Sequence, residues 1–517
     1  MAKSQRKRDQ EKVDEYIKRL ELARSATTVD VHETLTDKMN RIQRAKTDVK
    51  YLVKTYLPHY AEAESADFQI EFAGLVAHNP LFMGFAEWGR GLAKSVWCNI
   101  IIPLWLWVRG EDVFFCLMSD SKERAEELLS DIQAELDGNP LLINDFGEQK
   151  ADGDWTIGNF KTIDQRFIGM AFGIKKKVRG IRVGKRRPNL WSIDDLETPD
   201  TIGNPKRMRK QAEIIERDVI PTMTNKHHRR LLYANNRFAR VMTQTILQER
   251  HPHPKWFVHQ IKAYNKVTHE PAWDYYTADY YRQQEDNMGI PAAYAEYLHE
   301  TKLEGKIFSE DKIQWCKLPD LRDFEIIISH WDIAYTNNED SDYNAVRVWG
   351  LKDRRFYLID CFVKQVEMKD ACNWMCEFKK SLPGGVNILF QYESQFWNKE
   401  VQRNIEEAED EHGVFLNIMG VDIPRGTNKL GRIIRLVPYF QNSRIYYNIE
   451  LKSQSDTQIG IIQLCAIEEG SDEHDDAPDA DQYAISTLDK YTTSSRQEKS
   501  GGKPFKTGKM KHRYEIP

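Results

Sequence analysis

The sequence predicts an α/β protein built of two successive domains, and two observations predict it. From about residue 70, short apolar runs alternate with amphipathic segments, which is typical of a mostly parallel sheet covered by helices. From residue 319, three strand-like segments joined by short polar turns precede a further alternation of helix and strand. The chain has 517 residues, of which 41% are hydrophobic, so two folded cores are expected.

These patterns divide the chain into four parts. The expected parts are a helical N-terminal arm at 1–55, an α/β domain with its linker at 56–318, a second α/β domain at 319–491 and a flexible basic tail at 492–517. The arm is highly charged and carries an apolar stripe, which fits a helical cap on the next domain or a partner-binding arm. The tail is rich in Ser, Gly and Lys, which favours disorder.

The charge is acidic in total and basic in places. The formal net charge is −5, yet basic residues gather at Lys3–Arg8, at Lys175–Arg187 and at Lys503–Arg513. Such patches either engage phosphate groups or form solvated faces. The distribution therefore permits a nucleic-acid partner that the net charge alone does not indicate.

The composition also bounds the compartment. Seven cysteines are scattered, and no CxxC motif occurs, so a reducing compartment is expected. The charged N-terminus does not resemble a signal peptide. The longest apolar stretch, around Cys98–Val108, is too short to span a bilayer. We expect a cytosolic protein without a membrane partner.

The first α/β domain is expected to hold a phosphate site. Its predicted elements are a buried strand at Val113–Met118, a helix at Ser121–Leu136, and strands at Leu190–Ile193 and Ala239–Met242. Gly89-Arg90-Gly91-Leu92-Ala93-Lys94-Ser95 opens an apolar helix. A phosphate loop needs small residues that turn backbone N–H groups inward, a lysine for the β- and γ-phosphates and a hydroxyl for Mg²⁺. Lys94 and Ser95 meet the last two needs, although Ala93 replaces the usual glycine.

A second element of this site is the acidic end of the strand at Leu190–Ile193. Asp194 is suited to hold Mg²⁺, and Asp195 or Glu197 to orient the attacking water. The alternative is an acidic N-cap of the next helix. A third element is Thr245, placed at the end of the strand predicted at Ala239–Met242, where a hydroxyl can sense the γ-phosphate.

The second domain has the element order of the ribonuclease-H-like fold. The expected elements are strands at Phe324–Trp331, Ala345–Gly350 and Phe356–Asp360, a helix at Val366–Lys380, a strand at Val386–Tyr392, a helix at Lys399–Glu409 and a last helix from about Pro478. Three strands in a meander followed by strand and helix define that order.

Acidic residues stand at three key places in this domain. Asp332 ends the first strand, Glu393 ends the fourth strand, and Asp476 and Asp479 begin the last helix. A two-metal nuclease needs several carboxylates around two cations about 4 Å apart. We rank Asp476 before Asp479 as the third ligand, and Asp342 either assists or only shapes its turn.

Taken together, these motifs resemble the large terminase subunits of tailed bacteriophages over roughly residues 55–490. The resemblance is carried by residues 90–95, by 178–182, 187–190 and 193–197, by Asp332-Ile333-Ala334 with Ser341-Asp342-Tyr343, by 428–433 with 444–446, and by 474–480. It implies a P-loop NTPase domain with an ASCE-type parallel sheet, followed by a ribonuclease-H-like nuclease domain.

The resemblance implies roles for individual residues. Arg90, Gly91, Leu92, Ala93, Lys94, Ser95 and Asp194 would bind ATP and Mg²⁺, Asp195 or Glu197 would be the catalytic acid, Thr245 the coupling residue, and Arg179 or Arg90 an arginine finger. Asp332, Glu393 and Asp476 or Asp479 would hold two divalent cations, Mg²⁺ or Mn²⁺, for DNA cleavage.

The resemblance also implies partners and a location. The chain would form a ring on the portal vertex of a procapsid, with double-stranded DNA, the portal protein and a small terminase subunit as partners. It would act in the host cytoplasm, transiently at the portal, and would be absent from the mature virion.

Other classes of protein fit parts of the sequence. One is a ribonuclease-H-fold resolvase or recombinase with a degenerate nucleotide domain, and another is a helicase-like translocase. A third is a non-catalytic structural protein of the capsid vertex, in which neither set of carboxylates matters.

Overall fold

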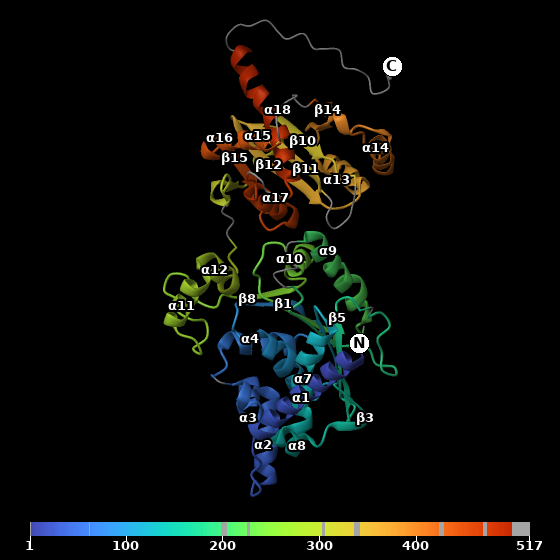
Figure 1. Ribbon diagram of the computed structural model, residues 1–517, viewed down its shortest axis with the longest axis vertical. Helices are drawn as coiled ribbons and strands as arrows, with labels where there is room; N and C mark the ends of the chain where they lie inside the picture. Colours follow the sequence, from blue (N-terminus) through green and yellow to red (C-terminus); the bar gives the residue numbers. More distant parts are fainter. Residues whose placement is uncertain are drawn as a thin grey trace. The chain divides into compact units, whose positions relative to one another are not determined.

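A computed structural model describes most of the chain in two compact units. The described residues are 2–61, 63–176, 178–197, 204–224, 228–301, 305–335, 342–422, 429–468 and 473–498, with side chains only within 10–492. The first unit comprises Met1–Lys302 and the second Leu303–Pro517 (Figure 1).

The first unit contains one large sheet and its helices. The helices are α1 Ala2–Ala26, α2 Leu35–Thr47, α3 Val49–Tyr56, α4 Asp67–His78, α5 Lys94–Val96, α6 Ile102–Val108, α7 Lys122–Gly138, α8 Pro140–Phe146, α9 Pro205–Ile214, α10 Thr243–Arg250, α11 Ala278–Met288 and α12 Ile290–Leu298. The strands are β1 Met83–Trp88, β2 Val113–Ser119, β3 Lys150–Thr156, β4 Asn159–Thr162, β5 Phe167–Gly173, β6 Leu190–Asp194, β7 Arg230–Ala234 and β8 Phe257–Ile261.

The strand order of this sheet identifies its class. The order across the sheet is β3-β4-β5-β2-β6-β7-β1-β8. Every two neighbouring strands in the part β5-β2-β6-β7-β1-β8 are parallel. One strand, β7, lies between β1, which leads into the phosphate loop, and β6, which ends in Asp194. This inserted strand defines the ASCE-type P-loop arrangement that was expected. Because the strands are parallel, the carboxyl ends of β1, β6 and β7 meet at one sheet edge.

Several predicted elements of the first unit are confirmed, and one is wrong. The strands at Val113–Met118 and Leu190–Ile193 correspond to β2 and β6, and the predicted helix corresponds to α7. Residues 239–242 form a bend leading into α10, so no strand exists there. The strand of this region is β7, whose residues are all buried.

The N-terminal arm packs on the first unit as a helical cap. Helix α1 lies against α7, where Lys12 pairs with Glu126 at 2.7 Å and Arg19 with Asp131 at 2.7 Å. The Tyr16 hydroxyl donates a hydrogen bond to Asp137 at 3.0 Å. These contacts, from Lys12 to Arg19, therefore support the cap interpretation of the arm.

The second unit has its own sheet and helices. The strands are β9 Gln314–Cys316, β10 Ile326–Asp332, β11 Asn344–Lys352, β12 Arg355–Lys364, β13 Ile388–Glu393, β14 Ile418–Val421 and β15 Ile445–Asn448. The helices are α13 Met368–Ser381, α14 Lys399–His412, α15 Lys429–Ile433, α16 Val437–Gln441, α17 Ser455–Cys465 and α18 Asp476–Glu498.

The second sheet has the expected ribonuclease-H-like topology. Its order is β14-β13-β10-β11-β12-β15-β9, with β10, β11 and β12 antiparallel and β13 parallel to β10. Strand β9 pairs with β15, so the unit begins before the boundary predicted at residue 318. Helix α18 also continues past residue 491 to Glu498, and the rest of the predicted tail lies outside the described residues.

Two hydrophobic cores lie on opposite faces of this sheet. Ile327 and Trp331 of β10 pack with α13 and α14, whereas Ile328 packs with α17 and α18. Successive residues of a strand point to opposite faces, so the alternation in β10 fills both cores. The carboxyl end of β10 is thereby fixed between two helical layers.

A buried ion pair joins α18 to the sheet beneath the carboxylates. Arg347 of β11 donates to Asp481 at 2.7 and 3.1 Å, and the Trp349 indole donates to the same carboxylate at 2.7 Å. Asp481 and Arg347 are both almost fully buried. This contact sets the rotation of α18 and hence the direction of Asp476 and Asp479.

Changing Asp481 to Ala is expected to lower the free energy of unfolding by about 3–5 kcal/mol, because Arg347 is left as a buried charge without its partner. Chemical denaturation of the full chain measures the effect. The control is Asp489→Ala on the same helix, whose partly exposed contacts with Arg444 and Tyr439 are expected to contribute only about 1–2 kcal/mol. Equal losses in both variants would contradict this account.

Within the described ranges, no helix is long and apolar enough to cross a membrane.

Candidate active sites

The phosphate loop of the first unit connects β1 to α5 at the shared sheet edge. Gly91 and Ala93 both adopt left-handed backbone conformations, with φ of 84° and 60°. Alternating handedness turns successive N–H groups toward one side, as an anion site requires. Ala93 accepts the conformation that glycine usually supplies, which explains how the loop forms without it. Lys94 then begins the helix.

The loop opens on a cleft of about 550 Å³. Its lining residues are Arg90, Lys94, Asp120, Ser121, Arg124, Asp195, Glu197, Asn235, Asn236, Phe238 and Glu296. They come from the carboxyl ends of β1, β2, β6 and β7 and from α12. Of the predicted loop residues, Arg90 and Lys94 face this cleft, whereas the Leu92 side chain is buried in the core.

Asp194 is the fully buried last residue of β6, and its surroundings suit a metal ion. The Asn99 amide donates to its Oδ2 at 2.6 Å, and Ser192 in turn donates to Asn99 at 2.6 Å. Burial, followed by the charge of Asp195, raises the pKa of Asp194 to about 6, while Lys94 and Ser95 lower it. Its buried Oδ1 has no well-formed hydrogen bond to any described residue. That open oxygen beside Lys94 and Ser95 fits Mg²⁺ of a bound nucleotide.

The two acids proposed for water activation differ sharply in surroundings. Asp195 has φ of 48°, and its side chain is about half exposed, 3.8 Å from Arg124. Glu197 is buried, and it accepts hydrogen bonds from the Tyr233 hydroxyl and the Asn235 amide and from the Thr243 N–H at 2.7 Å. Burial raises the pKa of Glu197, which makes its carboxylate a stronger base.

The role of Thr245 was predicted from a place at the end of a strand, but residues 239–242 form no strand. Thr245 lies in the first turn of α10, where its hydroxyl donates to Met242 O and accepts the Met242 N–H. Within residues 242–245, Thr243 contacts an acid of the site, because its backbone N–H donates to Glu197. At the end of β7, Asn235 holds Glu197 and Asn236 contacts Glu296. The apolar run at residues 231–234, just before Asn235, could have predicted β7 from the sequence.

The two arginines proposed as fingers lie at different places. Arg90 lines the cleft, where it is 3.9 Å from Glu296. Arg179 is largely exposed and pairs with Asp218. Arg179 is not among the residues that line the cleft in the described part of its own chain.

In the second unit, the four predicted acids come together. Asp332 ends β10, Glu393 ends the parallel neighbour β13, and Asp476 and Asp479 lie in the first turn of α18. Glu393, Asp476 and Asp479 are almost fully buried. Burial and the neighbouring acids raise the pKa of Asp332 well above its usual range, while Lys429 opposes the shift.

Two cations of α15 lie among these acids. Lys429 Nζ is 2.7 Å from Asp475, 3.7 Å from Asp479 and 3.9 Å from Asp332. Arg432 is 3.1 Å from Asp479 and 3.9 Å from Glu393. In the sequence, Lys429 and Arg432 were noted only as members of segment 428–433, without a role of their own. Their position at the acids was missed because α15 is distant in sequence from both β10 and α18.

The acids fit divalent metal ions. Asp332 Oδ2 is buried and accepts no hydrogen bond from any residue in the described ranges. Two side-chain cations do not balance four clustered carboxylates with Asp475 beside them, and a divalent ion would supply positive charge there. Carboxylate oxygens are also the ligands that Mg²⁺ and Mn²⁺ prefer.

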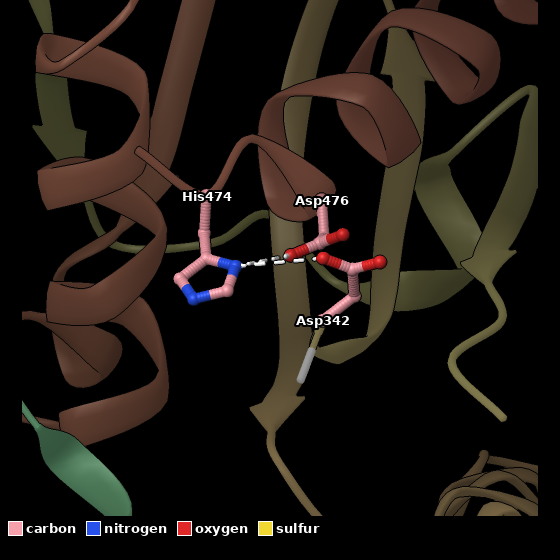
Figure 2. A group of neighbouring side chains, drawn as sticks. All are labelled: Asp342, His474 and Asp476. Carbon is pink, nitrogen blue, oxygen red and sulfur yellow. Dashed lines mark ion pairs between the residues drawn. The ribbon is translucent and has the colours of Figure 1, made fainter. Parts of the chain in front are cut away.

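A histidine extends this cluster at one side, as Figure 2 shows. His474 Nδ1 lies 3.6 Å from Asp342 and 3.8 Å from Asp476, and the three side chains converge. Asp476 Oδ2 also accepts the Tyr343 N–H at 3.1 Å. Asp342 therefore faces the acids from the turn before β11. His474 was quoted in the sequence motif without a role.

Metal binding to the second unit should weaken as the pH falls through about 6. Burial raises the pKa of Asp476 to about 6, so protons compete with the metal below that pH. Without metal, the folded state retains protons that the unfolded chain loses near pH 4, so this group's contribution to stability decreases as the pH rises from about 4 to 6. Metal reverses that loss because it replaces the protons.

Thermal denaturation with Mn²⁺ at pH 5, 6 and 7.5 measures this effect. The apparent affinity for Mn²⁺ should fall about tenfold per pH unit below 6 for each proton displaced. An Asp476→Asn variant should bind Mn²⁺ more weakly and show a shallower dependence on pH. The same Mn²⁺ affinity at all three pH values would contradict the prediction.

Fold and sites define a class of protein: a P-loop-type α/β unit followed by a ribonuclease-H-like unit with a buried cluster of carboxylates. No protein-family profile and no curated protein matches the chain at a significant level. Solved structures with similarity include the large terminase of a thermophilic bacteriophage, at 11% identity and a TM-score of 0.32 over 82% of this chain and 99% of that chain.

Two nuclease domains are also similar. The human cytomegalovirus terminase nuclease domain has 12% identity and a TM-score of 0.27, over 34% of this chain and 92% of that chain. The nuclease domain of the bacteriophage SPP1 large terminase, with bound Mn, has 18% identity and a TM-score of 0.25, over 36% and 99%. At these scores we base the function on the residues of the two sites.

Proposed function

We propose that the chain is the large subunit of a viral DNA-packaging motor. ATP hydrolysis in the first unit drives double-stranded DNA through the portal into a procapsid. The second unit cuts concatemeric DNA to start and end packaging. The observation that carries this proposal is the presence, in one chain, of a phosphate-loop cleft containing two acids and a separate cluster of four carboxylates.

In the first unit, each group has a task in phosphoryl transfer. Lys94 and the loop N–H groups would bind the phosphates, and Ser95 and Asp194 would hold Mg²⁺, which would neutralise charge on the phosphates. Glu197 orients the attacking water as a base, and Asn235 and Tyr233 position Glu197 by hydrogen bonds. Such positioning is the main protein contribution to this reaction.

In the second unit, Asp332, Glu393, Asp476 and Asp479 would hold two divalent ions, with His474 and Asp342 at one side. The ions would supply an activated water and stabilise the leaving oxygen of the phosphodiester. Lys429 would attract the DNA backbone and neutralise the acids before metal binds. Contacts to the backbone rather than to bases suit a motor that moves along any sequence.

Purified protein should hydrolyse ATP faster when linear double-stranded DNA is added. Lys94→Ala should lower the rate of this hydrolysis by at least about 100-fold. The control is Lys262→Ala, a surface lysine paired with Glu300, which should keep the activity. DNA-independent hydrolysis, or hydrolysis unchanged in Lys94→Ala, would favour a nuclease with a degenerate nucleotide unit. Separation of DNA strands would favour a helicase.

The remaining partners belong to the same proposal. Several copies form a ring at the portal, and a small terminase subunit selects the DNA. The chain acts in the host cytoplasm and leaves the capsid when packaging ends.

A further inference from the structure

A cationic side chain outside the phosphate loop faces the nucleotide cleft. Arg124 stands in the first turn of α7, which begins immediately after β2. The Ser121 hydroxyl accepts the Arg124 N–H at 3.2 Å and fixes this turn. Because β2 is the parallel neighbour of β6, the start of α7 lies at the same sheet edge as Asp194. Arg124 therefore lines the cleft together with Lys94.

The guanidinium of Arg124 lies between two carboxylates. Its Nη2 is 3.8 Å from Asp195 in the cleft, and its Nη1 donates to Glu127 Oε2 at 2.9 Å on the outer side. The side chain is 41% exposed, so it is free to turn inward. An anion in the cleft would compete directly with Glu127 for it.

We propose that Arg124 binds the γ-phosphate of ATP and so distinguishes ATP from ADP. This inference rests on the proposed ATPase function and adds a specificity-determining residue to it. Arginine presents paired N–H donors that match phosphate oxygens. In the absence of a triphosphate, Glu127 holds the guanidinium at the rim of the cleft. A γ-phosphate offers more charge than Glu127, and the side chain moves onto it.

Helix α1 lowers the free-energy cost of moving Arg124 from Glu127 to the phosphate. The other oxygen of Glu127, Oε1, accepts from Arg19 Nη2 of α1 at 3.4 Å, and Arg19 is anchored by Asp131 at 2.7 Å. When Arg124 leaves, Glu127 therefore keeps a cationic partner. Glu127 is also half exposed, so the loss of its pair with Arg124 costs little.

Binding of fluorescent ATPγS and ADP to the full chain with Mg²⁺ tests the proposal without turnover. Arg124→Gln should weaken ATPγS binding about tenfold and change ADP binding by less than about twofold. Arg124→Lys should restore part of the ATPγS affinity. Glu127→Gln should tighten ATPγS binding about twofold to fivefold, because the competing pair is lost.

The matched control is Lys122→Gln on the same turn of α7, which pairs with Glu126 rather than facing the cleft. It should leave both affinities unchanged. Equal losses for ATPγS and ADP in Arg124→Gln, or no loss, would overturn the assignment of Arg124 alone. If the unchanged protein bound neither nucleotide, the proposed ATPase function would fail together with this assignment.

Discussion

Changing Asp332 to Asn is expected to lower metal-dependent cleavage of supercoiled DNA by roughly 1,000-fold. Asp332 interacts electrostatically with the other three acids of the cluster. Asparagine replaces its charged carboxylate with a neutral amide, which binds a metal ion more weakly. Losses of about 10- to 100-fold are typical of groups that only orient a metal ligand, so a direct ligand should exceed them. The measurement is plasmid cleavage with Mg²⁺ or Mn²⁺.

The matched control for this change is Asp323→Asn. Asp323 is an exposed acid of the same unit, paired with Lys352 at 2.9 Å, and its loss should leave cleavage intact. DNA-stimulated ATP hydrolysis should also survive in Asp332→Asn, because that site belongs to the other unit. Full cleavage by Asp332→Asn would show that the carboxylate cluster does not take part in DNA cleavage.

Changing Glu197 to Gln is expected to lower the rate of ATP hydrolysis by about 10²- to 10⁴-fold with nucleotide binding retained. Glu197 is buried against the cleft and held by three donors, whereas Asp195 is half exposed beside Arg124. A glutamine oxygen can still accept hydrogen bonds from Tyr233 and Asn235. The amide nitrogen then faces the Thr243 N–H, and the amide cannot accept a proton from water. The measurement is steady-state turnover together with ATPγS affinity.

Asp195→Asn is the comparison that decides between the two acids. It should reduce turnover far less than Glu197→Gln does, because Asp195 is not positioned by several donors. The reverse order, with Asp195→Asn inactive and Glu197→Gln active, would make Asp195 the catalytic acid and Glu197 a structural one.

Local patterns predicted the strands that carry the sites. The carboxyl ends of β6, β10 and β13 were readable because a short apolar run ends in an acid. Asp194, Asp332 and Glu393 follow from that pattern, and the N-terminal turn of α18 was marked by Pro478. The order of these elements predicted an α/β first unit and a ribonuclease-H-like second unit, whereas the P-loop class of the first unit came from the loop motif and the family resemblance.

The parts that were missed depend on contacts between distant segments. β7 is as apolar as β6 but is followed by Asn235 and not by an acid, so it was overlooked, and Ala239–Met242 was predicted to be a strand instead. Lys429, Arg124 and His474 gain their positions only when helices and strands far apart in sequence pack together. Single-sequence patterns carry no information on such packing, and this is why the surroundings of Glu197 were not foreseen.

Filling of procapsids with DNA tests the central claim most directly. Purified protein, portal-bearing procapsids, the small subunit and linear DNA are incubated with ATP, and DNA protected from added nuclease is measured. The account predicts ATP-dependent protection that is lost with Lys94→Ala and retained with Asp332→Asn, because linear DNA needs no cut before it enters. Equal protection with Lys94→Ala, or protection without ATP, would contradict the claim that this chain is the motor.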